Sequence, residues 1–206
     1  MEKLKKTIHQ IIASEIPEKS NVLDLGCGDG VLLNYLMTDK KIKGHGVDIN
    51  SKAIVKCIEK GIPVIQLDLN SIPLDFSDKS FDIVILNQTL QEIFRPDKII
   101  DEMLRIGKVG ILGFLNFGTL KIRLTFLFSG KMPVTKELPY YWYNTPNIHL
   151  ATLKDFIDFC KKNKIKIQKS IYLKHKFISS EKLIKYKKIS FLPNIRSDLA
   201  IFIINK

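Results

Sequence analysis

The sequence predicts an α/β fold in which helices cover both faces of a doubly wound, largely parallel sheet. Short apolar segments typical of strands alternate along the chain with segments whose apolar residues recur at helical spacing. The segment 81–86 is an almost continuous apolar run, as expected for a strand that is buried on both faces. A glycine-rich turn at residues 26–30 directly follows the first predicted strand and leads into a helix. These three observations together predict the fold class.

The first half of the chain supplies four strands and the helices between them. Apolar residues at helical spacing predict an opening helix that Pro17 ends and a second helix that begins at Val31. Ser51 is a candidate N-cap for a third helix, whose apolar residues fall within 53–58. The strands, which are short and apolar, are expected at 21–25, 44–49, 63–67 and 81–86.

The second half of the chain completes the predicted sheet. A helix over about 96–106 leads to a fifth strand over about 108–115. A helix over about 152–162 leads to an alternating strand over 164–173, and the apolar run 199–204 is the closing strand. The prediction is therefore a Rossmann-like sheet of seven strands. Because nothing repeats and no linker-like composition interrupts the chain, all 206 residues are expected to form one domain.

The segment 116–150, which follows the fifth strand, is an aromatic insertion. It contains a predicted amphipathic helix over about 119–129. Connections of this length are usually functional or form lids. Its aromatic residues and prolines include Phe117, Phe126, Phe128, Pro133, Pro139, Tyr140, Tyr141, Trp142, Tyr143 and Pro146.

The net charge of +12, from 33 Lys and Arg against 21 Asp and Glu, raises the question of a polyanionic partner. Residues 151–206 hold 14 basic and 4 acidic residues and therefore carry +10 of that charge. Only 4 of the basic residues are Arg, which nucleic-acid-binding proteins use for bidentate and stacking contacts. We interpret the excess charge as a solvated surface, so nucleic acid is not expected as a partner. RNA binding through residues 160–190 is the minor alternative.

The composition shows no sign of membrane insertion, secretion or metal binding. No apolar run has membrane-spanning length, and the first residues form an amphipathic pattern instead of a signal-peptide core. The cysteines Cys27, Cys57 and Cys160 are scattered, and no Cys and His residues have metal-ligand spacing. We therefore expect a cytoplasmic protein in a reducing compartment, without membrane contact and without a metal site.

The turn after the first strand carries the clearest chemical meaning. It reads Asp-Leu-Gly-Cys-Gly-Asp-Gly from Asp24 to Gly30, and glycines at such a strand–turn–helix junction let backbone amides approach a ligand closely. The spacing departs from the dinucleotide fingerprint G-x-G-x-x-G, because Val31 stands where its third glycine belongs. Asp24 would repel a pyrophosphate and suit a cationic ligand. Taken alone, the turn could equally be structural.

Three further polar residues stand at predicted strand ends. Asp48 ends the second strand, 20 residues after Gly28, and suits a bidentate hydrogen bond to ribose hydroxyls. Asp68 ends the third strand and Asn87 the fourth. Alone, Asp48 could be an N-cap and Asp68 a loop residue, but in an open parallel sheet all these positions converge on one crevice. Together with Asp24 they fit a ligand with an adenine, a ribose and a positively charged amino acid, which is S-adenosylmethionine.

With these motifs in this order, the chain resembles the class I S-adenosylmethionine-dependent methyltransferases. The resemblance implies that the first-strand acid and the turn glycines hold the methionine portion of the cofactor. It also implies that the second-strand acid holds the ribose and the third-strand acid the adenine, and that S-adenosylhomocysteine would be the product in the same site. The predicted cofactor-binding residues are Asp24, Gly26, Cys27, Gly28, Asp48, Ile49, Asp68, Leu69 and Asn87.

More narrowly, the chain resembles the MetW family of methionine biosynthesis over about residues 20–172. The most specific stretches are Met-Pro-Val-Thr at 132–135 and Trp-Tyr-Asn-Thr-Pro-Asn-Ile-His at 142–149. This resemblance implies a role in methionine biosynthesis beside a homoserine O-acyltransferase. Leu115 stands where the family pattern has Pro, which we expect to loosen the loop after the fifth strand, and the Lys-rich residues 174–197 match poorly.

A catalytic base is not evident from the sequence. No Asn-Pro-Pro-Tyr motif follows the fourth strand, and Gln91, which cannot act as a base, stands where many small-molecule methyltransferases have His. The remaining catalytic candidates are His149 with Tyr140 or Tyr143, although a lone His is more often structural and such an aromatic run more often a lid or partner surface. Cys27 is interpreted as a packing residue, because nothing nearby in sequence would activate its thiol.

Two hypotheses about function follow. The intact cofactor motif without a base favours an S-adenosylmethionine-binding protein that associates with and supports the homoserine O-acyltransferase. The alternative is an active small-molecule methyltransferase whose methyl acceptor is unknown.

Overall fold

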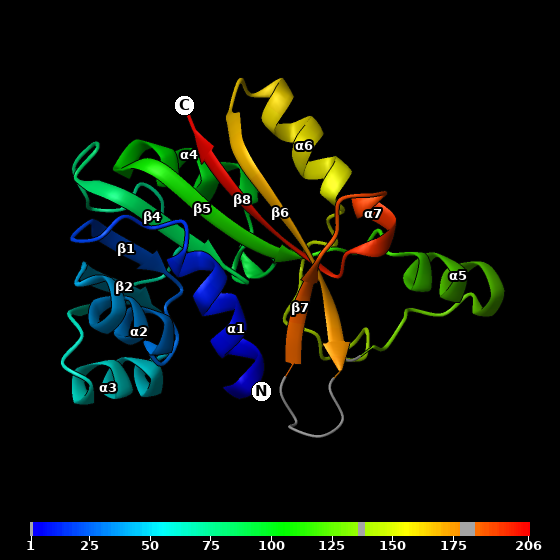
Figure 1. Ribbon diagram of the computed structural model, residues 1–206, viewed down its shortest axis with the longest axis horizontal. Coiled ribbons are helices and arrows are strands. Elements are labelled where there is room, and N and C mark those ends of the chain that lie inside the picture. Colours follow the sequence, from blue (N-terminus) through cyan, green and yellow to red (C-terminus); the bar gives the residue numbers. More distant parts are fainter. Residues whose placement is uncertain (1, 136–138, 178–183) are drawn as a thin grey trace.

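The computed structural model describes residues 2–135, 139–177 and 184–206, which form a sheet of eight strands with helices on both faces (Figure 1). The strand order is β3-β2-β1-β4-β5-β8-β6-β7. The strands are β1 (Asn21–Leu25), β2 (Lys43–Asp48), β3 (Val64–Gln66), β4 (Phe81–Asn87), β5 (Gly107–Leu115), β6 (Lys166–Phe177), β7 (Ile184–Lys188) and β8 (Leu199–Asn205). The helices are α1 (Glu2–Ala13), α2 (Val31–Lys40), α3 (Ser51–Glu59), the 3₁₀ helix η1 (Leu90–Glu92), α4 (Pro96–Ile106), α5 (Leu120–Ser129), α6 (Leu153–Lys162) and α7 (Pro193–Arg196).

The predicted doubly wound α/β fold is confirmed. Strands β1 to β5 pair in parallel, and β8 lies antiparallel between β5 and β6. The chain order reverses between β1 and β4, which creates the crevice that such sheets use for ligands. The predicted helices over 96–106, 119–129 and 152–162 correspond to α4, α5 and α6. The prediction that the helix over 119–129 is amphipathic is wrong, because the apolar residues of α5 are not gathered on one buried face.

The predicted number of seven strands is wrong, because the sheet has an eighth strand at its edge. Strand β6 extends past Leu173, where the predicted strand ends, and pairs antiparallel with β7. The sequence of β7, Ile-Lys-Tyr-Lys-Lys, has only a short apolar alternation at Ile184 and Tyr186 within a Lys-rich stretch, and Lys187 and Lys188 are exposed. Tyr186 anchors the strand: its ring lies 4.9 Å from that of His175, and it packs against the core beneath α1.

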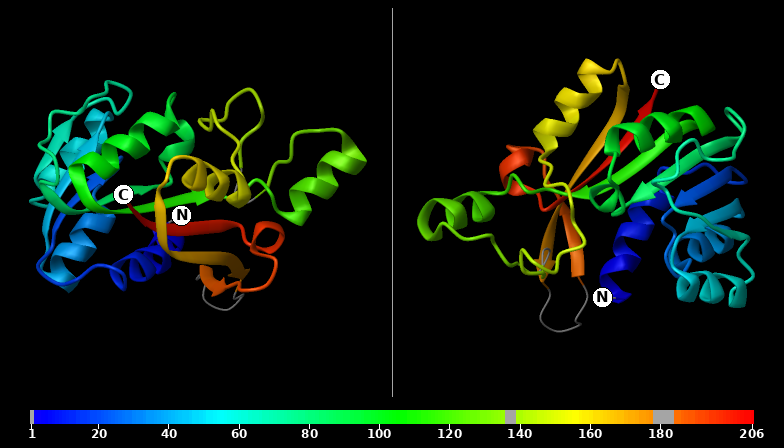
Figure 2. Two further views of the ribbon diagram at one scale, coloured as in Figure 1. Left: turned by 90° about the horizontal axis from the view of Figure 1, so that it is seen from above. Right: turned by 180° about the vertical axis from the view of Figure 1, so that it is seen from behind.

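The core lies in two layers, one on each face of the sheet. Figure 2 shows the helices that cover these two faces. Ile83 and Ile85 of β4 face the layer beneath α1, α2 and α3, whereas Val84 and Leu86 face the layer beneath α4 and α6. Successive residues of a strand point to opposite faces, so a strand covered on both sides must be apolar throughout. This double burial explains the continuous apolar run of residues 83–86.

The insertion 116–150 leaves the sheet at a well-anchored point. Asn116 is buried, and its Nδ2 donates to the carbonyls of Asn194 and Ser197 at 3.0 and 2.8 Å. The Leu115 backbone N–H donates to Gln91 Oε1 at 3.1 Å, a bond that proline could not supply. The expectation that Leu115 loosens this loop is therefore wrong. Beyond this anchor, α5 projects away from the sheet (Figures 1 and 2).

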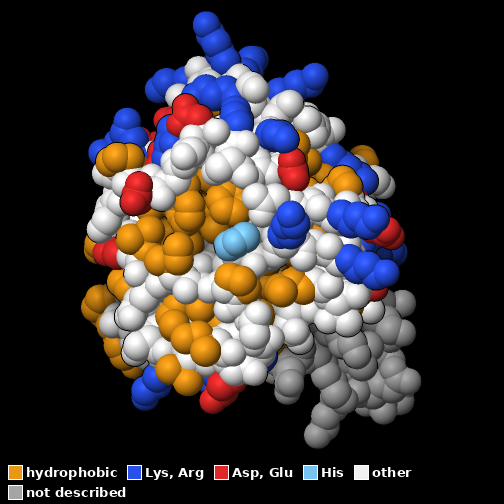
Figure 3. Space-filling view, turned by 90° about the vertical axis from the view of Figure 1, so that its left-hand side faces the viewer, with side chains coloured by type: hydrophobic (Ala, Val, Ile, Leu, Met, Phe, Trp, Pro, Cys, Tyr) orange, Lys and Arg blue, Asp and Glu red, His pale blue; other side chains and the backbone are white. Residues whose placement is uncertain are grey.

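The surface shows no concentrated basic track on the face that Figure 3 presents. There, Lys and Arg side chains lie in separate groups, with Asp, Glu and hydrophobic side chains between them (Figure 3). Among the residues that the structure describes, no helix is long and apolar enough to span a bilayer.

Candidate functional site

The glycine turn after β1 has a geometry that only glycine accommodates without strain. Gly26, Gly28 and Gly30 have φ angles of +75°, +56° and +71°. A Cβ on Gly26 would lie 2.4 Å from Thr89 Oγ1, so this position also excludes side chains by contact. The backbone N–H groups of Gly26 and Cys27 donate to the Val47 carbonyl at 2.8 and 3.0 Å, which ties the turn to β2.

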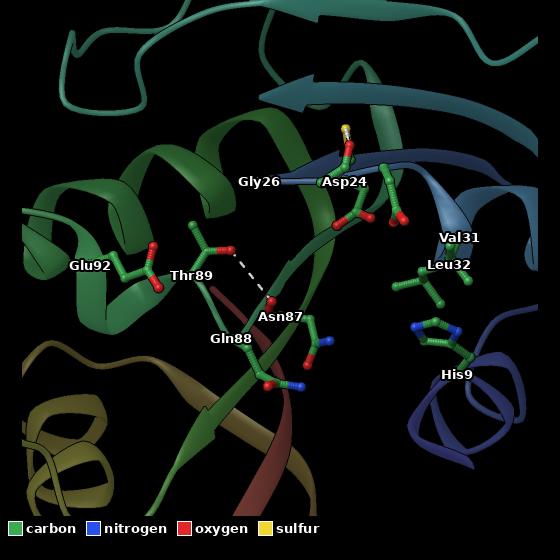
Figure 4. A pocket seen from close by; sticks show the side chains of 12 residues that line it. His9, Asp24, Gly26, Val31, Leu32, Asn87, Gln88, Thr89 and Glu92 are labelled. Atoms are coloured by element: carbon green, nitrogen blue, oxygen red, sulfur yellow. Dashed lines mark hydrogen bonds between the residues drawn. The ribbon is translucent and has the colours of Figure 1, made fainter. Parts of the chain in front are cut away.

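Two adjacent cavities open at the carboxyl ends of the parallel strands. The first has a volume of about 320 Å³ and lies between the glycine turn, the end of β4 and α1 (Figure 4). The second has a volume of about 230 Å³ and lies beside the ends of β2 and β3. Gly26, Thr89 and Glu92 line both, so the two cavities form one continuous crevice.

All nine predicted cofactor-binding residues line this crevice, although they come from four separate strand ends. The first cavity is lined by Asp24, Gly26, Cys27, Gly28 and Asn87, and the second by Gly26, Asp48, Ile49, Asp68 and Leu69. The convergence follows from the strand order, because β3, β2, β1 and β4 are consecutive neighbours in the sheet.

Asp24 and Asp48, the acids at the ends of β1 and β2, differ in burial and in hydrogen bonding. Asp24 is buried, and burial, followed by the nearby charge of Asp48, raises its pKa to about 7. Asp48 accepts hydrogen bonds from the backbone N–H of Gly28 at 2.7 Å and of Asn50 at 2.9 Å. Asp48 is therefore oriented by the backbone, whereas Asp24 is a buried acid whose ionisation a cationic ligand would favour.

The second cavity combines a fixed carboxylate with apolar surface. Asp68 Oδ1 accepts from the backbone N–H of Asn70 at 2.9 Å, and Asn70 Oδ1 accepts from the backbone N–H of Phe94 at 2.9 Å. Leu69 is buried and Ile49 is exposed at the same cavity. This arrangement offers a flat apolar ligand such as a purine both a surface to cover and a carboxylate at its edge.

The first cavity also contains two titratable side chains that the sequence did not indicate. His9 projects from α1 on one side, and Glu92 of η1 lies on the other (Figure 4). Burial, followed by the charge of Asp48, raises the pKa of Glu92. The position of Glu92 shortly after a strand end could have suggested a role in the site, but no sequence motif indicates His9.

Asn87 lies between His9 and Glu92 (Figure 4). Its buried Oδ1 has no hydrogen-bond partner among the described residues, as expected at a site that binds a polar ligand.

The three catalytic candidates lie elsewhere. Neither cavity is lined by Tyr140, Tyr143 or His149. Tyr140 lines a separate small hollow within the insertion, and Tyr143 is exposed. His149 has its Nε2 3.2 Å from the Phe94 carbonyl. The structure thus brings together the predicted cofactor residues but does not bring these three to them.

Gln91 is a structural clamp between η1, β5 and the insertion. It is buried; its Nε2 donates to the carbonyls of Leu115 and His149, and its Oε1 accepts from the Leu115 N–H. Its own carbonyl accepts from the N–H groups of Ile148 and His149. This position needs a side chain that both donates and accepts, which explains the amide found there.

Replacing this clamp is expected to destabilise the protein. Gln91→Ala leaves partly buried backbone groups of Leu115 and His149 unpaired and should lower the free energy of unfolding by about 2 to 3 kcal/mol. Urea denaturation measures the change. The matched control is Gln10→Ala on the exposed side of α1, expected to stay within about 0.5 kcal/mol. Equal stabilities of the two variants would contradict the clamp.

Cys27 behaves as a packing residue in this setting. It is buried, and burial followed by the charge of Asp24 raises the pKa of its thiol well above the usual range.

Within the described part of the chain, no group of three or more His, Cys, Asp or Glu is arranged to hold a metal ion.

Solved structures similar to this chain share its fold. An S-adenosylmethionine-dependent methyltransferase from Thermotoga maritima has a TM-score of 0.69 and 17% identity, covering 97% of this chain and 87% of that protein. The [4+2]-cyclase SpnF has a TM-score of 0.63 and 16% identity, covering 97% of this chain and 80% of that protein. The second is named for a cyclisation, so the shared fold does not by itself fix the reaction.

Sequence comparison identifies the family. A profile described as "Methionine biosynthesis protein MetW" matches residues 6–204. The bifunctional methionine biosynthesis protein MetXA/MetW of Rhodopirellula baltica is 34% identical over 166 residues, which are 76% of this chain and 27% of that protein. The chain thus spans about a quarter of the length of that relative. It has the class I methyltransferase fold and belongs to the MetW family of methionine biosynthesis proteins.

Proposed function

We propose that the chain binds S-adenosylmethionine in the crevice at the ends of β1, β2, β3 and β4. The observation that carries this proposal is the charge of the crevice: Asp24, Asp48 and Asp68 line it, and no Lys or Arg is among its described lining residues. The cofactor has a sulfonium and an ammonium group, which such a crevice favours. When bound, it supplies an activated methyl group.

Each part of the crevice suits one part of this cofactor. Asp24 and the glycine turn would hold the methionine portion, where Asn87 offers its unpaired Oδ1. Asp48 would accept the ribose hydroxyls, since its carboxylate is already oriented by two backbone N–H groups. Asp68 would accept the adenine amino group while Leu69 contacts the ring. Cys27 and Ile49 would contribute packing surface.

The same chain would act with a homoserine O-acyltransferase in methionine biosynthesis, in the cytoplasm. Support comes from the MetW family itself and from the relative in Rhodopirellula baltica, whose name joins MetXA and MetW in one bifunctional protein. Proteins fused in one organism commonly act together when separate in another. The absence of a base at Gln91, whose side chain is fully committed to backbone groups, favours a supporting role over catalysis.

The acyltransferase assay tests this role directly. Adding the purified chain and S-adenosylmethionine to the purified homoserine O-acyltransferase should raise its specific activity several-fold, and the two proteins should co-purify. The Asp48→Ala variant, which loses the proposed ribose contact, shows whether the bound cofactor is needed. Neither association nor activation with the wild-type chain would refute the partnership.

A second candidate function is methyl transfer to a small molecule, and one observation favours it. His9 and Glu92 face the first cavity from opposite sides, in the cavity proposed for the methionine portion of the cofactor (Figure 4). Either could position or deprotonate an acceptor. Incubating the protein with methyl-labelled cofactor and a metabolite extract should then label a product, and Asp48→Ala should abolish it. Absence of any labelled product rules out this alternative.

A further inference from the structure

Helix α5 presents an apolar surface that nothing in the described chain covers. Its apolar residues lie around the whole circumference instead of along one stripe, and Ile122 is its buried residue. Leu127 and Phe128, near its tip, are 73% and 80% exposed. A helix that is apolar all round is normally buried within a protein, yet α5 projects from the molecule (Figures 1 and 2). Such a contiguous exposed apolar patch marks an interaction site.

A second exposed feature of the same insertion is the aromatic turn, residues 140–143. Trp142 and Tyr143 are 72% and 67% exposed. The rings of Tyr141 and Tyr143 stack in parallel with centroids 5.5 Å apart, and Trp142 lies edge-on to Tyr143 at 5.7 Å. Asn144 closes the turn: its Oδ1 accepts from the Tyr141 N–H at 2.9 Å and its N–H donates to the Tyr141 carbonyl at 3.2 Å. Preorganised aromatic side chains of this kind dominate binding energy at protein interfaces.

The charge of the insertion 116–150 indicates which kind of partner could bind its exposed apolar surface. Residues 116–150 contain four Lys or Arg residues, Lys121, Arg123, Lys131 and Lys136, and a single acidic residue, Glu137. In a symmetric dimer built on this surface, the same patch would face itself and bring like charges together. A lipid surface also fits poorly, because membrane-bound helices have a strongly polar face, which α5 lacks. A partner protein with an apolar groove and an acidic rim is complementary to both features.

We propose that α5 and the aromatic turn form the surface on which the homoserine O-acyltransferase docks. This inference rests on the proposed partnership and specifies where it is made. Helix α5 inserts its apolar tip into a groove of the acyltransferase, the aromatic turn supplies a second contact, and Lys121 and Lys131 face carboxylates at the rim of that groove. The cofactor crevice lies outside this surface, so the two can be altered independently.

Charge substitution on α5 tests the docking surface. The double variant Leu127→Glu/Phe128→Glu should weaken binding to the purified acyltransferase by about 30-fold or more, measured by isothermal titration calorimetry. Because both residues are exposed, the variant should fold normally and keep its affinity for S-adenosylmethionine. The matched control is Val55→Glu/Ile58→Glu, which places the same two charges on apolar residues that are 54% and 63% exposed, on α3 at the opposite end of the molecule (Figure 1). It should bind the acyltransferase like the wild type.

The outcomes separate this inference from the partnership on which it rests. If the wild-type chain does not bind the acyltransferase, both are overturned. If it binds and the double variant binds equally well, the partnership stands and the docking surface is overturned. Sedimentation of the chain alone, and flotation with vesicles of anionic phospholipid, complete the test. Self-association or vesicle binding that the double variant abolishes would assign the surface to a second copy or to a membrane instead.

Discussion

Raising the pH from 5 to 8 is expected to lower the stability of the ligand-free protein. The residue responsible is Asp24, whose pKa in the folded protein is raised to about 7 by burial and, secondarily, by Asp48. The unfolded chain, with an ordinary pKa near 3.8, has already lost this proton above about pH 4. Between these values the folded state binds more protons, so the free energy of unfolding falls as the pH rises. Each pKa unit corresponds to about 1.4 kcal/mol, and the folded state keeps its extra proton over about two of the pH units between 5 and 8, so the loss over this range is on the order of 3 kcal/mol.

The affinity for S-adenosylmethionine is expected to change in the opposite direction over the same range. The cationic cofactor favours the ionised form of Asp24, so affinity should rise until the pH exceeds about 7 and then level off. The Asp24→Asn variant should be more stable than the wild type at pH 8 and should bind the cofactor more weakly there. Opposite effects of one substitution on stability and binding distinguish a functional acid from a structural one.

Urea denaturation and calorimetric titration at pH 5, 6, 7 and 8, on both proteins, measure the two effects. The other ionisable side chains of the crevice include His9, Asp29, Asp48 and Glu92, but they are present in wild type and variant alike. The difference between the two proteins at each pH therefore isolates Asp24. Parallel pH profiles would show that Asp24 does not titrate in this range and would contradict the prediction.

The crevice could be predicted from sequence because its geometry is encoded locally. Asp24 and the glycines after it lie within one short turn, and Asp48 and Asp68 each follow a recognisable strand. In a parallel sheet, strand ends meet at one edge, so identifying the strands was enough to bring distant residues together. The same reasoning identified the fold class, since the apolar run of β4 indicates burial on both faces.

Features that depend on contacts between distant segments could not be predicted in this way. His9 reaches the crevice only because α1 packs beside the end of β4, and its own surroundings in sequence are an ordinary amphipathic helix. The sequence indicates only that Gln91 stands where many small-molecule methyltransferases have a basic His. It does not indicate that the Gln91 side chain donates a hydrogen bond to the carbonyl of His149, 58 residues away. Strand β7 forms through pairing with β6 despite its Lys-rich sequence, and the helical periodicity of α5 did not reveal that it projects from the protein.

Adding a methyl group at Gly26 is expected to destabilise the protein and abolish cofactor binding. The backbone there has φ +75°, which costs a residue other than glycine about 1 to 2 kcal/mol. The new Cβ would also lie 2.4 Å from Thr89 Oγ1 and 2.7 Å from Thr89 Cγ2. Relieving that overlap costs about 1 to 3 kcal/mol more and shifts the turn against the crevice. Gly26→Ala should therefore lose about 2 to 5 kcal/mol in urea denaturation and show no cofactor binding by calorimetry.

Two further variants separate backbone strain from contact. Gly61 has a similar φ of +69°, but a Cβ there meets nothing within 4 Å, so Gly61→Ala should show the backbone cost alone and bind the cofactor normally. Thr89→Ala removes both atoms nearest the new Cβ and leaves only Thr89 Cβ, at 3.0 Å. The double variant Gly26→Ala/Thr89→Ala should therefore be more stable than Gly26→Ala, with a favourable coupling of about 1 to 3 kcal/mol. If the two substitutions were simply additive, Thr89 would not be the residue that requires glycine at position 26, and the cost would lie in the backbone alone.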